Sequence, residues 1–287
     1  MKVLVIGGSG MLGSDLISEL TRRGHDVESP SSKECDITDP EAIATIALTR
    51  GDFDWCVNCS AYTAVDKAES EVREATELNA FGPGYLANAC GLAGIKLIQI
   101  STDFVFDGNA SIPYGADAPT NPLGVYGKTK WEGEQAVLSA NPNALIARTS
   151  WLFGPNGRSF PKTMIGAWDA GKSLKVVADQ TGCPTYTGDL ARVLVDLIEK
   201  NAYPGIYHAC GPTVTTWHAF AIEAIEAWKA AKGDDRPVEI EPIPTEAYPT
   251  PAKRPKYSVL DTSKLTDLGI TPMPTLRQAL VEFVARL

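Results

Sequence analysis

A tyrosine and a lysine four residues apart, Tyr126 and Lys130, are the residues of this chain best suited to proton transfer. On a helix, residues at this spacing lie on one face, one turn from each other. An ammonium group roughly 4 Å from a phenol contributes about 4 kcal/mol at an effective dielectric constant of 20, which lowers a phenolic pKa of about 10 by on the order of three units. Lys128 is a rival for the lysine, but two residues from Tyr126 it lies on another helix face.

A hydroxyl group is predicted to complete this site. Thr102 follows an apolar run that is typical of a strand, and it precedes Tyr126 in the chain. A hydroxyl at a strand end can hold a substrate oxygen between itself and Tyr126. The predicted catalytic residues are therefore Thr102, Tyr126 and Lys130.

A glycine-rich turn lies near the N-terminus, between a hydrophobic strand and a helix. Gly7, Gly10 and Gly13 give the spacing G-x-x-G-x-x-G. Such a turn lets backbone N–H groups and a helix N-terminus approach a pyrophosphate without obstruction by Cβ atoms. The turn, with Met11 and Leu12 inside it, is therefore predicted to bind a dinucleotide cofactor.

Alternating strands and helices must position these residues. Apolar runs predict strands over residues 2–6, 26–29, 55–58, 96–101 and 145–149, and helical patterns cover residues 11–23, 40–48, 71–93 and 131–139. This alternation indicates an α/β fold with a doubly wound parallel sheet of the Rossmann type over residues 1–150. Pro83 falls inside the helix predicted over residues 71–93, so we expect a kink or a late start there.

The composition changes after residue 150. Residues 152–162, 178–189 and 242–257 are rich in Pro, Gly, Thr and Tyr, and helices are predicted over residues 162–170, 188–200, 217–231 and 275–286. We expect a smaller substrate-binding lobe over residues 151–287, with crossings back to the first domain.

Charge and cysteine usage exclude several classes of protein. The net charge of −9 argues against nucleic acid or an anionic membrane as a partner. The chain starts directly with a strand, which leaves no room for a signal peptide, so we expect a cytoplasmic protein. Cys56 and Cys59 have the spacing of a redox or metal pair, but on a strand their side chains alternate between faces, and we expect reduced structural thiols.

These motifs together resemble the short-chain dehydrogenase/reductase superfamily, particularly its extended, sugar-nucleotide branch. The resemblance implies that Asp36 and Ile37, after the second strand, contact the adenine of the cofactor. It also implies that Ser60, Ala61 and Tyr62, in a loop after the third sheet strand, lie along the cofactor.

The choice of nicotinamide cofactor depends on the end of the second strand. Ser29 and the nearby Lys33 suit the 2′-phosphate of NADPH, whereas Glu28 would favour NADH by repelling that phosphate. We expect NADPH, with Ser29 among its contacts and NADH as the alternative.

Longer stretches narrow the resemblance to the dTDP-4-dehydrorhamnose reductase family, nearly end to end. The matching stretches are residues 61–69, 101–108, 121–130, 148–151, 179–185 and 254–264. The family implies reduction of the 4-keto group of dTDP-6-deoxy-L-lyxo-4-hexulose to dTDP-L-rhamnose, a cell-envelope precursor. It also implies that Thr102, Asp103 and Trp151 contact this nucleotide sugar. A buried core position is the alternative for Trp151.

Three other functions are known among proteins with related motifs. Sugar-nucleotide 4,6-dehydratases typically carry an acidic residue where this chain has Phe104, which cannot exchange a proton. A 4-epimerase or another nucleotide-sugar 4-reductase stays open on the catalytic residues alone. The third is a regulatory subunit resembling the β-subunit of methionine adenosyltransferase, which keeps a cofactor site.

Several other polar residues have no partner at a spacing typical of a metal site or a proton relay. A homodimer is possible, with a divalent ion held by Asp15 and Asp189 at the contact, but the favoured role for both is surface solvation, and no metal site is predicted. His208 lies in an apolar strand pattern and is expected to be a hydrogen-bonded core residue. His218 shows no spacing that suggests a metal or a proton relay.

Overall fold

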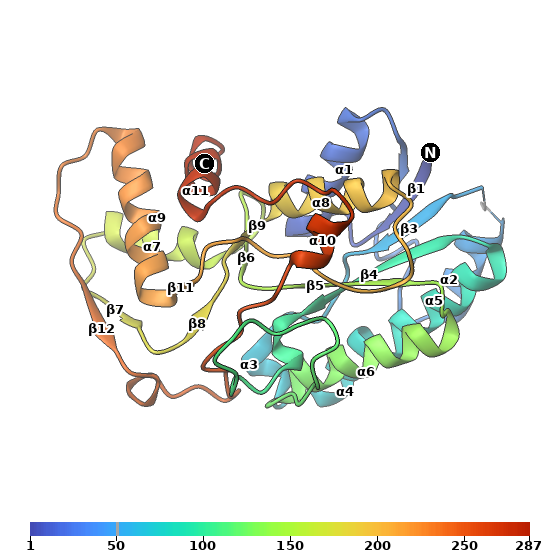
Figure 1. Cartoon of the computed structure of the whole chain (residues 1–287), viewed down its shortest axis with the longest axis horizontal. Helices are drawn as coiled ribbons and strands as arrows, with labels where there is room; N and C mark the ends of the chain where they lie inside the picture. Colours follow the sequence, from blue (N-terminus) through green and yellow to red (C-terminus); the bar gives the residue numbers. More distant parts are fainter. Residues whose placement is uncertain (50–51) are drawn as a thin grey trace.

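A six-stranded parallel sheet forms the centre of the molecule (Figure 1). The computed structural model describes residues 1–49 and 52–287. The strand order is β10-β5-β4-β3-β1-β2. The strands are β1 (Lys2–Ile6), β2 (Asp26–Glu28), β3 (Trp55–Asn58), β4 (Lys96–Thr102), β5 (Leu145–Thr149) and β10 (Gly205–His208). The order reverses between β1 and β3, which is where ligands bind in open α/β sheets.

Helices cover both faces of this sheet, which confirms the doubly wound α/β fold. One face is covered by α1 (Met11–Arg22) and α8 (Thr187–Glu199), and the other by α2 (Pro40–Ala44), α5 (Gly82–Ala93) and α6 (Val125–Ala140). Val3 and Val5 pack with the first pair of helices, whereas Leu4 and Ile6 pack with the second group. Both faces of β1 are therefore buried, as a continuous apolar run requires.

The single helix predicted over residues 71–93 is wrong in detail. The structure has α4 (Val72–Thr76), a π-helical turn at Glu77–Phe81, and then α5 with Pro83 in its first turn. Backbone angles stay helical through Phe81 and Gly82, so the segment is continuous from Val72 to Ala93 and the late start expected at Pro83 is wrong. The π-helical turn directly before Pro83 is the irregularity there. A short helix, α3 (Val65–Ala68), precedes this segment.

The second lobe has an apolar core of its own. It is built from α7 (Phe160–Asp169), α9 (Trp217–Lys232) and α11 (Leu276–Ala285), which bury Phe153, Phe220 and Phe283 between them. A parallel pair, β7 (Leu174–Val177) and β12 (Ile240–Ile243), lies at the outer side of the lobe (Figure 1). The remaining elements are short: β6 (Leu152–Phe153), β8 (Thr181–Gly182), β9 (Thr185–Tyr186), β11 (Thr215–Thr216) and α10 (Ser263–Asp267).

The chain returns to the first lobe after residue 150. Helix α8 packs on α1, and β10 pairs in parallel with β5. Both crossings follow from sequence: the α8 residues between Leu190 and Ile198 that face β1 and β3 are apolar. The division at residue 150 stays a prediction, with these two elements as its crossings. Across residues 1–49 and 52–287, the structure has no helix long and apolar enough to cross a membrane.

Candidate active site

The glycine turn lies against the loop that follows β3, at the switch point of the sheet. Gly7 has φ +79°, and a Cβ there would lie 2.7 Å from the Ser60 backbone nitrogen. A Cβ at Gly13 would lie 2.2 Å from the Gly7 carbonyl oxygen. No side chain caps the N-terminus of α1 among the described residues. The first N–H groups of α1 are therefore left for a ligand, which suits a pyrophosphate.

The other predicted cofactor contacts differ in what their side chains do. Leu12 and Ile37 are core residues, so only their backbone groups can face a cofactor. The Ser29 hydroxyl donates a hydrogen bond to the Val5 carbonyl at 2.8 Å. Asp36 is exposed, and its Oδ1 accepts hydrogen bonds from the backbone and side chain of Thr38.

The loop after β3 is held in place by buried amides. Asn58 donates to Gln99 at 2.8 Å, and its own Oδ1 accepts from the Ser60 backbone N–H at 3.0 Å. Asn79 bonds both backbone groups of Tyr62 and donates to the Thr129 hydroxyl on α6. The half-buried Ser60, Ala61 and Tyr62 are therefore fixed between the glycine turn and α6.

The three predicted catalytic residues come together at the carboxyl end of β4. The Thr102 hydroxyl has both Asp103 Oδ1, at 3.1 Å, and the Tyr126 hydroxyl within reach of its single hydrogen, and its interaction with Tyr126 lowers the Tyr126 pKa. The Phe104 ring meets the Tyr126 ring edge to face, with centroids 5.6 Å apart. A Cβ at Gly127 would lie 2.2 Å from the Phe104 carbonyl oxygen, so this glycine lets α6 approach the strand end closely.

The electrostatics of the tyrosine differ from expectation. Burial raises the pKa of Tyr126 to about 12, and the hydrogen bond from Thr102 opposes this only in part. The Lys130 ammonium donates to the Ile100 carbonyl at 2.7 Å, and burial lowers its pKa to about 8. The predicted lowering of the Tyr126 pKa by Lys130 is therefore wrong for the protein groups alone, because burial dominates and Lys130 is not among the groups that shift this pKa. Lys128 is exposed and lies 3.9 Å from Glu132, so the rival lysine points away from the site.

Asp103 lies deeper than a residue that simply faces substrate. It is 1 % exposed, and its Oδ2 is buried with no hydrogen-bond partner among the described residues. Burial raises its pKa to about 6. Its Oδ1 accepts the Thr102 hydrogen, so Asp103 orients Thr102, and its contact with the substrate stays a prediction.

Trp151 is half-buried and has an unusual backbone conformation, with φ +46°. Its ring stacks on Trp217, and a Cβ at Gly182 would lie within 2.5 Å of it. A non-glycine residue in this region of φ stores strain and often marks a functional site. Trp151 packs against the apolar core of the second lobe while part of it stays exposed, so its contact with the substrate stays a prediction beside the core alternative.

Known proteins resemble this chain in both sequence and structure. The family model described as the RmlD substrate binding domain matches residues 1–287. The chain is 40% identical to a dTDP-4-dehydrorhamnose reductase of Mycolicibacterium smegmatis over 286 residues, covering 99% of this chain and 85% of that protein. The crystal structure of a dTDP-4-dehydrorhamnose reductase from Clostridium acetobutylicum is similar, with a TM-score of 0.93, 38% identity and 99% of both chains covered.

The chain belongs to the dTDP-4-dehydrorhamnose reductase family. The family predicted from the sequence motifs is therefore confirmed. A family structure from Bacillus anthracis, in complex with NADP, has a TM-score of 0.93 at 34% identity over 100% of this chain and 99% of that one. A Thermus thermophilus UDP-glucose 4-epimerase matches with a TM-score of 0.81 at 22% identity, which shows the shared fold alone.

Sequence reasoning missed several polar residues that hold the reductase site together. Glu134 on α6 and Arg148 on β5 form a fully buried ion pair beneath it. Asn79 and Gln99 fix the loop after β3, and Trp217 stacks on Trp151. A signal was present for some of them, since Gln99 and Arg148 interrupt strands that are otherwise apolar.

The structure differs from the predictions made for Asp15, Asp189 and His208. Asp15 and Asp189 are buried, not solvated. Asp15 accepts hydrogen bonds from Thr187 and from Arg286, and within the described residues no group of three or more His, Cys, Asp or Glu side chains could hold a metal ion. His208 is a core residue as predicted, but neither of its ring nitrogens has a hydrogen-bond partner in the described part of the chain. The Phe106 ring meets the His208 ring edge to face, and burial lowers the His208 pKa to about 4.

Cys56 and Cys59 lie on different faces of the sheet, as the alternation of a strand predicts. All six cysteines are free thiols. Cys56 packs with the core on one face of the sheet and Cys59 with the core on the other, so they do not form a pair.

His218 bonds the Ile240 carbonyl through Nε2 at 2.9 Å.

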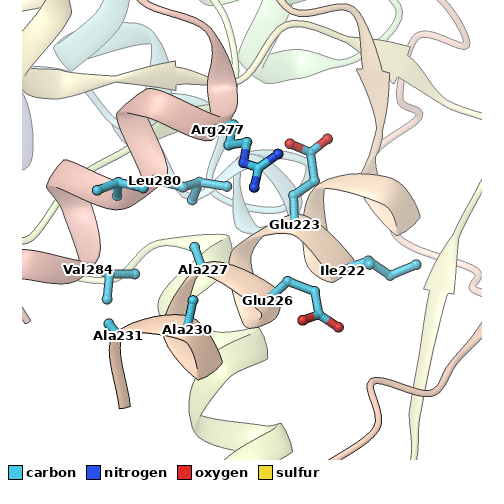
Figure 2. Close-up of a pocket in the computed structure, with 10 residues that line it drawn as sticks. Ile222, Glu223, Glu226, Ala227, Ala230, Ala231, Arg277, Leu280 and Val284 are labelled. Carbon is cyan, nitrogen blue, oxygen red and sulfur yellow. The ribbon is translucent and has the colours of Figure 1, made fainter. Parts of the chain in front are cut away.

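A groove between α9 and α11 lies outside this site (Figure 2). Its lining is mostly aliphatic, and the figure shows Glu223 of α9 facing Arg277 of α11 across its upper end. None of the predicted site residues lines it.

Proposed function

We propose that this protein reduces the 4-keto group of dTDP-6-deoxy-L-lyxo-4-hexulose to dTDP-L-rhamnose, with NADPH as the reductant. The observation that carries the proposal is that the Thr102 hydroxyl, at the carboxyl end of β4, lies against the Tyr126 hydroxyl of α6, at the edge of the parallel sheet where the glycine turn also follows β1. Two hydroxyl groups side by side can hold one carbonyl oxygen. Full-length similarity to reductases of this substrate supports the choice of ketone.

The cofactor fits the residues present. The turn at Gly7 and Gly13 has no space for a Cβ, and the free end of α1 favours a phosphate group. Ser60, Ala61 and Tyr62 would line the remaining length of the cofactor. When bound, NADPH supplies the hydride for the sugar carbon. NADPH is favoured over NADH by the exposed Ser29 near Lys33, and by the NADP held in the Bacillus anthracis structure.

Proton transfer falls to Tyr126. Its raised pKa keeps the hydroxyl protonated at neutral pH, so it can donate a proton to the substrate oxygen as negative charge develops there. Thr102 would hold that oxygen in place. Lys130 would bind the nicotinamide ribose and stabilise the negative charge on Tyr126 after the proton has left. Trp151 would pack on the apolar face of the sugar.

Reduction is favoured over the related reactions of nucleotide sugars. Elimination of water needs an acid or base beside the Thr102–Asp103 pair, and Phe104 packs there against Tyr126 instead. A Streptomyces antibioticus relative, 41% identical over 98% of this chain and 94% of its own length, is named as a probable dTDP-4,6-dihydroxy-2-methyloxan-3-one 4-ketoreductase. Its name supports a 4-keto reduction in this branch.

Turnover of the 4-keto sugar nucleotide tests the proposal. In the presence of the 4-keto sugar nucleotide, the wild-type protein should oxidise NADPH and form the 4-hydroxy product. It should oxidise NADPH faster than it oxidises NADH. Tyr126→Phe should lower kcat by about 10²–10⁴-fold without changing the Kd for NADPH. The exposed Tyr85 on α5 offers a matched control, and Tyr85→Phe should retain activity. Absence of wild-type turnover, with tight binding to a methionine adenosyltransferase, would support the regulatory-subunit alternative instead.

A further inference from the structure

A buried ion pair joins the catalytic helix to the sheet directly beneath the site. Glu134 is 0 % exposed and Arg148 is 2 % exposed. Arg148 donates to Glu134 Oε1 through Nε at 2.8 Å and to Oε2 through Nη2 at 2.7 Å. The Ser101 hydroxyl donates to the same Oε1, and Arg148 Nη1 donates to the Ala116 carbonyl at 3.2 Å.

The pair is aligned with the catalytic residues on both elements. Tyr126, Lys130 and Glu134 follow one another at four-residue spacing, so they share one face of α6. On β4, consecutive residues meet this face: the Ile100 carbonyl accepts from Lys130, Ser101 donates to Glu134, and Thr102 bonds Tyr126. Ser101 and Arg148 are also register partners on β4 and β5. Glu134 therefore joins two strands to the helix at one point.

Stability alone does not explain this arrangement. Two charges lose their hydration on burial, and replacing such a pair by apolar residues of similar volume is often neutral or stabilising. A bidentate pair does fix geometry, because both carboxylate oxygens and the planar guanidinium must keep their relative orientation. The placement of this pair next to Lys130 gives that fixed geometry a use.

We propose that Glu134 is a positioning residue, which through Arg148 and Ser101 fixes α6 on the sheet and holds the charged Lys130 against the Ile100 carbonyl. The inference rests on the proposed function for its consequence in catalysis. Its structural content, the place and charge of Lys130, can be measured without turnover.

The groups around Lys130 come from three elements. Tyr126 and Glu134 lie on its own helix, Cys59 lies after β3, and the Ile100 carbonyl lies on β4. Burial lowers the Lys130 pKa to about 8, and the Glu134 carboxylate is the first group that opposes it, followed by Cys59. Removal of the Glu134 charge should therefore lower the Lys130 pKa further and leave more of the lysine neutral at pH 8.

Titration of Lys130 by nuclear magnetic resonance tests the inference. The ¹³Cε signal of Lys130 in lysine-labelled protein, assigned with Lys130→Met, should titrate at lower pH in Glu134→Gln than in the wild type. Glu132→Gln is the matched control: it removes an exposed carboxylate from the same helix and should leave the titration unchanged. An unchanged Lys130 titration in a folded Glu134→Gln protein would overturn the inference.

Glu134→Gln leaves the Arg148 charge buried without its partner, so this variant can lose its fold. The double variant Glu134→Gln/Arg148→Met removes both charges and should keep near-wild-type thermal stability. It should still show the lowered Lys130 titration, and an unchanged titration there would overturn the inference equally.

Activity supplies the second readout. In both variants the alkaline limb of the plot of kcat against pH should move to lower pH. At pH 8, kcat should fall by about tenfold, because the reduction needs Tyr126 and Lys130 in their protonated forms. Glu132→Gln should keep the wild-type profile. An equal loss of kcat at every pH would indicate a merely structural role and overturn the proposal. Absence of turnover in the wild type would count against the proposed function alone, since the titration of Lys130 is measured independently.

Discussion

Trp151 and Trp217 lie face to face, with ring centroids 3.6 Å apart and ring planes at 10° to each other. Trp151 directly follows β5 of the central sheet and Trp217 begins α9, and both rings pack against the core of the second lobe. Phe160 meets the edge of Trp217 from α7. The stack therefore helps to hold Trp151 at its strained φ of +46°.

Trp217→Ala should raise KM for the nucleotide sugar several-fold and change kcat little, because Trp151 then loses the ring that holds its orientation. The measurement is steady-state kinetics with the 4-keto sugar nucleotide at saturating NADPH. Trp228→Ala, on the same helix and bonded to Asp169, is the control and should keep the wild-type KM. Equal effects of the two variants on KM would contradict a specific role for the stack.

Gly13→Ala should weaken NADPH binding by about tenfold or more, since its Cβ would meet the Gly7 carbonyl oxygen at 2.2 Å and displace the turn that is to face the pyrophosphate. Calorimetric titration with NADPH measures this. Gly166→Ala, at an exposed site in α7 with no atom within 4 Å of the new Cβ, should leave binding intact and stabilise the protein by about 0.5–1 kcal/mol. Unchanged affinity in Gly13→Ala would place the cofactor elsewhere.

Asp103→Asn should remove a pH dependence of stability between about pH 4 and pH 6. The folded-state pKa of Asp103 is raised from 3.8 to about 6, so the folded protein holds this proton more tightly than the unfolded chain. The free energy of unfolding of the wild type therefore falls as pH rises through this window, by roughly 3 kcal/mol. Above about pH 6 the loss is complete.

Urea unfolding at a series of pH values measures this slope. Asp107 provides a control of opposite sign, because hydrogen bonds from Asn109 and Tyr114 lower the pKa of its carboxyl. Asp107→Asn should therefore lower stability at neutral pH, whereas Asp103→Asn should raise it. A wild-type slope that persists in Asp103→Asn would assign the proton to another group.

Arg286→Ala should destabilise the protein by about 1–3 kcal/mol, because it leaves the buried Asp15 carboxylate with one partner fewer. Arg286 Nη2 donates to Asp15 Oδ1 at 2.8 Å, and Asp15 is 3 % exposed at its side chain. Arg22→Ala removes an exposed partner of Glu19 and should cost clearly less stability than Arg286→Ala. Comparable losses in the two variants, measured by urea unfolding, would argue against burial as the cause.

The sequence alone was sufficient for the fold class and the family, and the site residues of the proposed function were also named from it. Continuous apolar runs such as residues 2–6 show strands buried on both faces, and glycines at positions 7, 10 and 13 show a turn that excludes side chains. These are local signals, since each depends on the type of residue at a fixed spacing. They survive without any knowledge of what packs against them.

Tertiary structure decided what depends on neighbours distant in the chain. The Tyr126 pKa rises because other segments bury the ring, although the spacing to Lys130 predicted a lower value. Asp15 is buried because α8 and Arg286 cover it, and Glu134 finds Arg148 only when α6 packs across β4 and β5. Burial and pairing with residues distant in the chain set the free energy of the charged form of each side chain. Neither can be predicted from the spacing of residues along the chain.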